Sequence, residues 1–67
     1  MQENLTKREK QILLMRAEGL YQTEIAKQLY LSIQTVKVYT TNTYIKLNAR
    51  NATQAMYLAL KKGLIGF

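Results

Sequence analysis

The chain is short and strongly basic. It has 67 residues, with ten lysines and arginines against four acidic residues and a formal net charge of +6. A single domain of this size buries only about 60% of its unfolded surface, so its stability is marginal. The absence of cysteine and histidine excludes disulfides, zinc sites built from Cys or His, and catalysis by Cys or His nucleophiles. We therefore expect a non-enzymatic domain without a cofactor.

The excess of basic residues favours a polyanionic partner, with nucleic acid first. The alternative is that the charge only keeps the domain soluble. No apolar run approaches the ~20 residues of a membrane span. Residues 1–4 also lack the features of a signal peptide. The expected location is the cytoplasm.

Caps and glycines mark the ends of the expected helices, because the chain contains no proline. Thr6 and Glu9 have the spacing of a capping box, in which each side chain bonds the other residue's amide. Gly19 ends the helix, since glycine adopts the left-handed conformation at no steric cost. The first helix is expected at about residues 7–18.

A second, short helix fits residues 22–29, and residues 30–31 form a connector. Ser32 is a good N-cap for a third helix at 33–47, which Asn48 ends in the left-handed region. The apolar spacing places Val36, Tyr39, Thr40, Thr43 and Leu47 on the inner side of this helix, and Gln34, Lys37, Val38, Thr41 and Tyr44 on its outer side. Of the five tyrosines, we expect Tyr30, Tyr39 and Tyr44 to be packing residues.

Asn51 is the expected cap of a fourth helix at about residues 52–62, which Gly63 ends. The residues that share its inner face are Ala55, Leu58, Ala59 and Lys62. Residues 64–65 are expected to fold back onto the core. The fold class is therefore all-α, with four helices in a single domain at 1–67.

Two helices joined by a tight turn, the second capped by serine, form the helix-turn-helix plan, here at residues 22–47. In this plan the second helix enters the major groove and presents the side chains near its N-terminus to the bases. The outer side chains offer a cation, a methyl-bearing group, an amide and a hydroxyl, namely Lys37, Val38, Gln34 and Thr41. The lysine suits guanine, the valine suits the thymine methyl, the glutamine suits adenine, and the threonine suits polar base edges.

The chain from Leu5 to Ile65 resembles the DNA-binding domain of LuxR/GerE-type regulators. The family's opening pattern LTxRE matches residues 5–9, and its pattern EIAxxLxxSxxTVKxH matches residues 24–39 except at the last position. The KL pair matches Lys46 and Leu47, and the closing pattern matches Ala55 and the GLI run at 63–65. Proteins of this type commonly carry an N-terminal receiver or ligand-sensing domain, and short stand-alone members also exist.

The resemblance implies sequence-specific binding of double-stranded DNA by a transcription regulator. It aligns Lys37, Val38 and Thr41 with positions that face bases, and the chemistry of the helix adds Gln34. The positions expected to contact the DNA backbone are Gln22, Thr23, Thr35, Tyr39 and Lys46. For Thr35, a bond within its own helix is an equal alternative.

Four residues depart from the family pattern. Tyr39 stands where histidine is common, and its hydroxyl preserves a phosphate contact. Thr43 replaces isoleucine, which we expect to loosen the core. Ala52 replaces an arginine near the fourth helix, and Thr41 is shorter than the lysine sometimes found at its position.

The fourth helix aligns with the dimerisation helix of the family. Met56, Tyr57 and Leu60 are expected to form an exposed apolar strip on it, which suggests a partner. A two-fold dimer through this strip would place two recognition helices about one turn of DNA apart. The alternative is that these residues cover the edge of the core.

Three other functions stay open at this point. The first is a promoter-recognising domain of a sigma factor, for which contact with RNA polymerase is the discriminating observation. The second is a protein-interaction module that has lost DNA binding. The third, a peptide bound to a membrane surface, fits poorly because the basic residues are spread over all four helices.

Overall fold

The computed structural model describes residues 5–66 as four helices, without a strand in that range. The helices are α1 (Lys7–Ala17), α2 (Gln22–Leu29), α3 (Ile33–Leu47) and α4 (Ala52–Lys61). The expected all-α class is confirmed, and the expected bounds agree to within one residue. None of these helices is long and apolar enough to cross a membrane.

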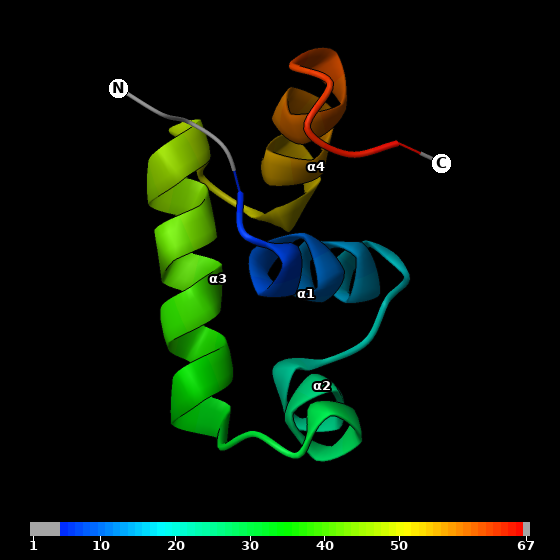
Figure 1. The fold of residues 1–67 in the computed structure, drawn as a ribbon, viewed down its shortest axis with the longest axis vertical. Coiled ribbons are helices and arrows are strands. Elements are labelled where there is room, and N and C mark those ends of the chain that lie inside the picture. The colour runs from blue at the N-terminus through cyan, green and yellow to red at the C-terminus, as the bar shows by residue number, and fades with distance from the viewer. Residues whose placement is uncertain (1–4, 67) are drawn as a thin grey trace.

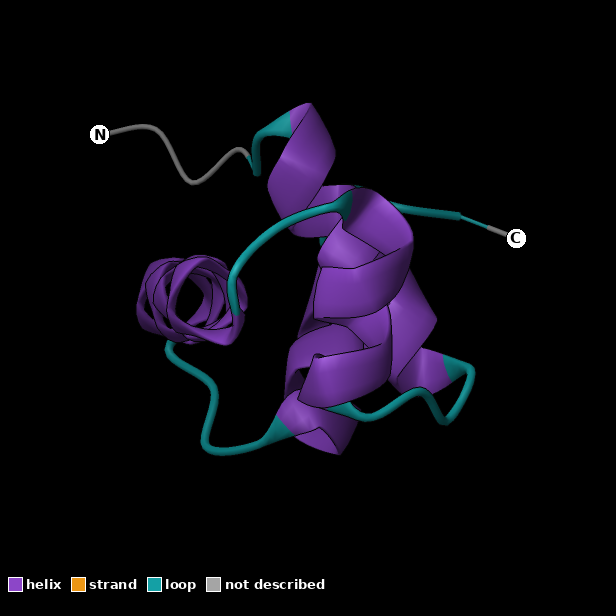
Figure 2. Cartoon of the chain, turned by 90° about the horizontal axis from the view of Figure 1, so that it is seen from below, coloured by secondary structure: helices purple, strands orange, loops and turns teal. Residues whose placement is uncertain are grey.

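The longest helix, α3, lies along one side of the molecule (Figure 1). Helix α1 crosses beside its middle, with α2 near the start of α3 and α4 near its end. Figure 2 looks along the axis of α3 and shows the other three helices on a single side of it. One face of α3 is therefore left without a covering helix.

Side-chain caps begin three of the helices as the sequence predicts. Thr6 Oγ1 accepts from the Glu9 amide at 3.1 Å, and Asn51 Oδ1 accepts from the Gln54 amide at 2.8 Å. Ser32 does the same for α3. Helix α2 uses a contact that was not anticipated. The Tyr21 amide donates to the Glu24 carboxylate at 2.8 Å. Each contact satisfies an amide that the helix itself leaves unpaired.

Left-handed residues follow the helices at Gly19, Asn48 and Gly63, as predicted. Tyr30 also adopts this conformation, with φ of 57°, at the turn between α2 and α3. A residue with a Cβ pays about 1–2 kcal/mol for it. The turn is held by a 2.9 Å hydrogen bond from the Leu31 amide to the Ala26 carbonyl. The prediction that Tyr30 is a packing residue is wrong, because its side chain points out of the turn and is 95% exposed.

The core consists of two clusters on either side of α1. The α4 cluster contains the buried residues Leu5, Leu13, Leu47, Ala55, Met56 and Ala59. The α2 cluster contains Ile12, Ile25, Ala26 and Val36. Successive residues of α1, Ile12 and Leu13, thus enter different clusters, and α3 contributes to both. Helices α1 and α3 therefore connect the two halves of the domain.

The predicted inner side of α3 is confirmed. Val36, Thr40, Thr43 and Leu47 are buried, and Tyr39 is half-buried against the α2 cluster. The predicted outer side is confirmed for Gln34, Lys37, Val38 and Thr41, which are exposed. Tyr44 is different: it is half-buried and packs against the α4 cluster. Its outer placement is wrong because a large ring reaches back over the edge of the core, although it does pack, as expected of a tyrosine.

On α4, the expected inner residues Ala55 and Ala59 are buried, Leu58 is half-buried and Lys62 is exposed. The expectation that Met56 lies on an exposed strip is wrong. Its side chain is only 8% exposed and belongs to the α4 cluster. The small neighbours Ala55 and Ala59 leave room for a long, flexible side chain. The fold-back of Leu64 and Ile65 onto this cluster is confirmed.

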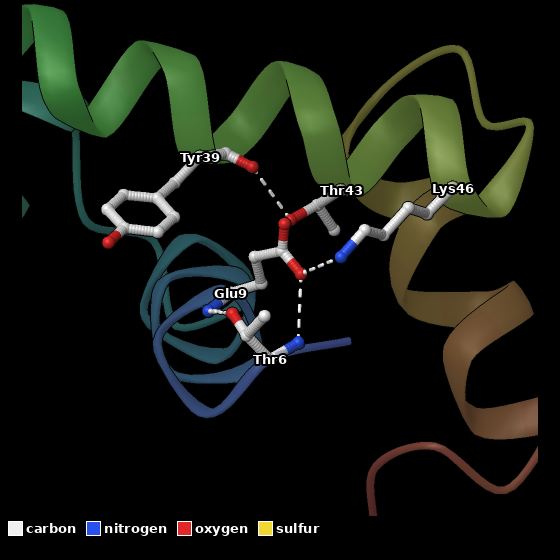
Figure 3. A network of polar contacts seen from close by, with 5 residues as sticks. All are labelled: Thr6, Glu9, Tyr39, Thr43 and Lys46. Atoms are coloured by element: carbon white, nitrogen blue, oxygen red, sulfur yellow. Dashed lines mark hydrogen bonds and ion pairs between the residues drawn. The ribbon is translucent and has the colours of Figure 1, made fainter. Parts of the chain in front are cut away.

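Glu9 joins the start of α1 to the end of α3 (Figure 3). Its Oε1 accepts from the Thr6 amide at 2.9 Å and from Lys46 Nζ at 2.7 Å, while the residue is only 3% exposed. Burial by itself raises the pKa of the Glu9 carboxyl. The hydrogen bonds from Lys46 and Thr6 and the lysine's charge outweigh that burial and hold the pKa below its ordinary value.

The two buried threonines of α3 differ in their hydrogen bonding. Thr43 Oγ1 donates to the Tyr39 carbonyl at 2.8 Å (Figure 3). Thr40 Oγ1 is buried without a hydrogen-bond partner, and it lines a small cavity between α1 and α3. An unpaired buried hydroxyl costs about 1–3 kcal/mol. Thr40 therefore lowers the stability of the domain, whereas the hydroxyl of Thr43 is satisfied.

Replacing Thr40 with valine should raise the free energy of unfolding by about 1 kcal/mol, because it removes the unpaired hydroxyl at constant shape. The matched variant Thr43→Val should destabilise by less than about 1 kcal/mol, because it removes a formed hydrogen bond. Urea denaturation of both variants measures the difference. A less stable Thr40→Val protein would contradict the assignment of Thr40 as unsatisfied.

Replacing Glu9 with glutamine should destabilise the domain by about 1–2 kcal/mol at pH 7, because Lys46 loses its counter-charge. The lowered pKa means that the charged carboxylate stabilises the fold above its ordinary pKa of about 4.5. That stabilisation disappears as the pH falls through the lower pKa of the folded state. Denaturation curves from pH 7 to about pH 3 should therefore show the two proteins converging. A gap that does not change with pH would contradict this, and Glu18→Gln, at an exposed glutamate of α1's C-cap, is the control.

Candidate nucleic-acid interface

The uncovered face of α3 carries a compact group of polar and apolar side chains. Gln34, Lys37, Val38, Thr41 and Asn42 are all exposed and together line a shallow hollow. The structure thus brings the four predicted base-facing residues onto one surface. It adds Asn42, which the sequence analysis missed. Its position four residues after Val38, one helical turn away, was the available signal.

The N-terminus of α3 lies beside this group and is built around Ser32 and Thr35. Ser32 Oγ accepts from the Thr35 amide at 3.1 Å, and the two hydroxyl oxygens are 2.9 Å apart. The sequence left open whether Thr35 contacts DNA or bonds its own helix, and in the structure its hydroxyl lies within hydrogen-bond distance of the Ser32 hydroxyl at the N-cap of α3. If Ser32 donates its proton to Thr35, the Thr35 hydroxyl keeps its own proton for an acceptor outside the chain.

The other residues expected at the DNA backbone lie at the start of α2 and on the flank of α3. Gln22 is half-buried and Thr23 exposed, in the first turn of α2. A helix N-terminus favours an anion, because its first amides point outward unpaired. Tyr39 is half-buried against the α2 cluster. These residues and Thr35 come from the two helices of the helix-turn-helix unit.

Lys46 is placed differently from the other residues of this set. It lies in the last turn of α3, and its ammonium is paired with Glu9 across the interior at 2.7 Å. The side chain remains 33% exposed. A phosphate would therefore share this ammonium with the Glu9 carboxylate. The phosphate contact of Lys46 stays a prediction, while its role in joining α3 to α1 is a property of the fold.

Two of the three acidic residues in the range 5–66, Glu9 and Glu24, lie in the first turn of a helix. Glu9 accepts from the Thr6 amide and Glu24 from the Tyr21 amide. Residues 5–66 contain no group of three or more acidic residues placed to hold a metal ion. These two carboxylates thus pair with nearby amides, and on the exposed face of α3 the charged group is Lys37.

The exposed part of α4 is smaller than the sequence suggested. Tyr57 and Leu60 are exposed, and Lys61 Nζ lies 5.9 Å from the centre of the Tyr57 ring. Ala52 is half-buried and lines a hollow between α1 and α4, together with Arg16 and Met56. The family's arginine is thus replaced by a small side chain at the edge of this hollow.

Comparison with known proteins identifies the family. Residues 3–59 match the model of bacterial regulatory proteins of the luxR family. The transcriptional regulatory protein LiaR of Bacillus subtilis (strain 168) is 43% identical over 63 residues. The response regulator protein VraR is 41% identical over 63 residues, both in Staphylococcus aureus (strain NCTC 8325 / PS 47) and in Staphylococcus epidermidis (strain ATCC 35984).

Each of these alignments covers 94% of this chain but only 30% of the relative. The chain therefore corresponds to one part of these larger regulators. The matched segment includes the whole helix-turn-helix unit and most of α4. The protein belongs to the luxR family of bacterial regulatory proteins, whose helix-turn-helix domain binds DNA in transcription regulation.

Proposed function

We propose that this domain recognises a specific sequence of double-stranded DNA by placing the uncovered face of α3 in the major groove. The observation that carries the proposal is the shared exposure of Gln34, Lys37, Val38 and Thr41 on the face turned away from the core. The major groove of DNA is wide enough to admit one α-helix, so an uncovered helix face can reach the base edges. The net charge of +6 favours the approach to a polyanion.

The proposed backbone contacts flank this face. These contacts would bind phosphates and so fix the position of α3 in the groove. The residues proposed for them are Gln22 and Thr23 at the start of α2, and Thr35 and Tyr39 on α3. Lys46 completes the proposed set, sharing its charge with Glu9. Contacts of this kind carry no sequence information themselves, but they set which base pairs the side chains of α3 can reach.

The wider setting of the domain follows from this proposal. A regulator of bacterial transcription acts in the cytoplasm, where the DNA lies. We propose that the domain acts by binding and has no catalytic role. Contact with RNA polymerase is a further expectation for such a regulator, and copurification with the core enzyme tests it. The competing function is that of a protein-interaction module that has lost DNA binding.

The first experiment is a selection from a random pool of duplexes at two salt concentrations. A specific domain should enrich one motif. If DNA is retained in a salt-dependent way but no motif is enriched, the domain contacts only the DNA backbone. No retention at low salt would favour the protein-interaction module.

Lys37→Ala should weaken binding to the selected duplex by about 1–3 kcal/mol and relax the choice of base at one position, because a lysine that bonds guanine is lost. The measurement is competition between the selected duplex and unrelated DNA. The matched control is Lys27→Ala, which removes an exposed lysine from α2. If the Lys37 variant weakens binding to all sequences equally, the lysine contacts phosphate and does not recognise a base.

We also propose a homodimer through α4, now restricted to Tyr57 and Leu60 because Met56 is buried. A two-fold pair would place two α3 helices about one turn of DNA apart. Leu60→Glu should convert the dimer to a monomer, because it places a charge in the apolar contact. Analytical ultracentrifugation gives the mass, with Gln28→Glu on exposed α2 surface as control. A monomeric parent protein, or an unchanged mass of the variant, would contradict the interface.

A further inference from the structure

We propose that Asn42 recognises an adenine in the bound DNA, which extends base recognition beyond the first turns of α3. This inference rests on the proposed function, because it requires α3 to lie in the major groove. Neither the family pattern nor the expected chemistry of the helix assigns a role to Asn42. Three observations support it: the position of Asn42, its lack of internal contacts, and the spacing of its neighbours.

The position of Asn42 is on the face that would meet the bases. It lines the same hollow as Lys37, Val38 and Thr41, and its side chain is exposed. A side-chain amide carries one acceptor and two donor hydrogens in a plane. It therefore matches adenine, which presents N7 as acceptor and the N6 amino group as donor in the major groove.

Asn42 makes no side-chain hydrogen bond or ion pair with any other residue in the range 5–66. Its amide thus keeps all its hydrogen-bonding groups for a partner outside the chain. Asparagine is also a weak helix former, costing about 0.7 kcal/mol relative to alanine in a helix interior. Asn42 neither caps α3 nor stabilises it, so the fold gains nothing from this residue type.

The exposed residues around Asn42 are spaced so that they share one face of α3, as in a helix that lies along a DNA groove. Val38, Thr41, Asn42 and Ile45 stand at i, i+3, i+4 and i+7, and the two apolar members are 57% and 71% exposed. The third helix of homeodomains contacts bases from four positions with this spacing, and an asparagine at the third of them binds adenine. The common factor is helix geometry, since these positions share one face over about 10 Å of helix.

Asn42 and Gln34 would not compete for the same base. They are eight residues apart, which is about 12 Å along α3, or more than three base steps at 3.4 Å each. The shorter side chain of Asn42 also has fewer rotatable bonds to immobilise than that of Gln34. The two amides would therefore recognise separate base pairs, with Val38 and Thr41 between them.

The test compares the motifs that the parent chain and Asn42→Ala select from a random duplex pool. The parent motif should contain an adenine at one position, and the variant should lose about 5- to 150-fold of its preference there. Preferences at the other positions and binding to unrelated DNA should stay unchanged. Gln28→Ala, which removes an exposed amide from α2, should leave the motif intact. Thermal melting should show both variants folded, because both side chains are exposed.

The outcomes separate this inference from the proposed function. If the parent chain selects a motif and Asn42→Ala selects the same motif with the same preferences, only the role of Asn42 is overturned. If the variant loses affinity for all duplexes equally, Asn42 contacts the backbone, and the adenine assignment is wrong. If the parent chain selects no motif at all, the proposed function fails, and this inference fails with it.

Discussion

The contact between Glu9 and Lys46 connects the beginning of α1 to the end of α3. Helix α3 is the one with a face that no other helix covers. Glu9 Oε1 accepts hydrogen bonds both from the Thr6 amide at the start of α1 and from the Lys46 ammonium, 37 residues later in the chain. Removing Lys46 from this pair would be costly, because it would leave the buried Glu9 carboxylate without its counter-charge. The start of α1 and the last turn of α3 are therefore joined by this pair as well as by the packing of the core.

Packing holds α3 in a helical form that its own sequence supports only weakly. Thr40, Thr41 and Thr43 are β-branched and lose rotamer freedom in a helix. Two of the three are buried, where Thr43 bonds a carbonyl of its own helix and Thr40 has no partner. The third faces outward. A helix held by one face in this way keeps the other free for contacts outside the chain.

The features that the sequence predicts well are those with local causes. The caps at Thr6 and Asn51 depend on residues three positions apart, and helical spacing separates the inner from the outer side of α3. What could not be predicted depends on tertiary contacts. Met56 is buried because its neighbours are small, and Lys46 meets Glu9 only once α1 lies across α3. Tyr30 is an exception with a local cause, because hydrogen bonds of the α2–α3 turn hold it in a conformation that usually favours glycine.

The division of the core into two clusters has a consequence for how such a domain can diverge. The α2 cluster supports the helix-turn-helix unit, while the α4 cluster supports the helix with exposed Tyr57 and Leu60. The two clusters meet only through α1 and α3. Substitutions on the outside of α4 can therefore accumulate without disturbing the packing beneath the start of α3. The proposed dimer contact on α4 and the proposed base contacts on α3 can therefore change independently of each other.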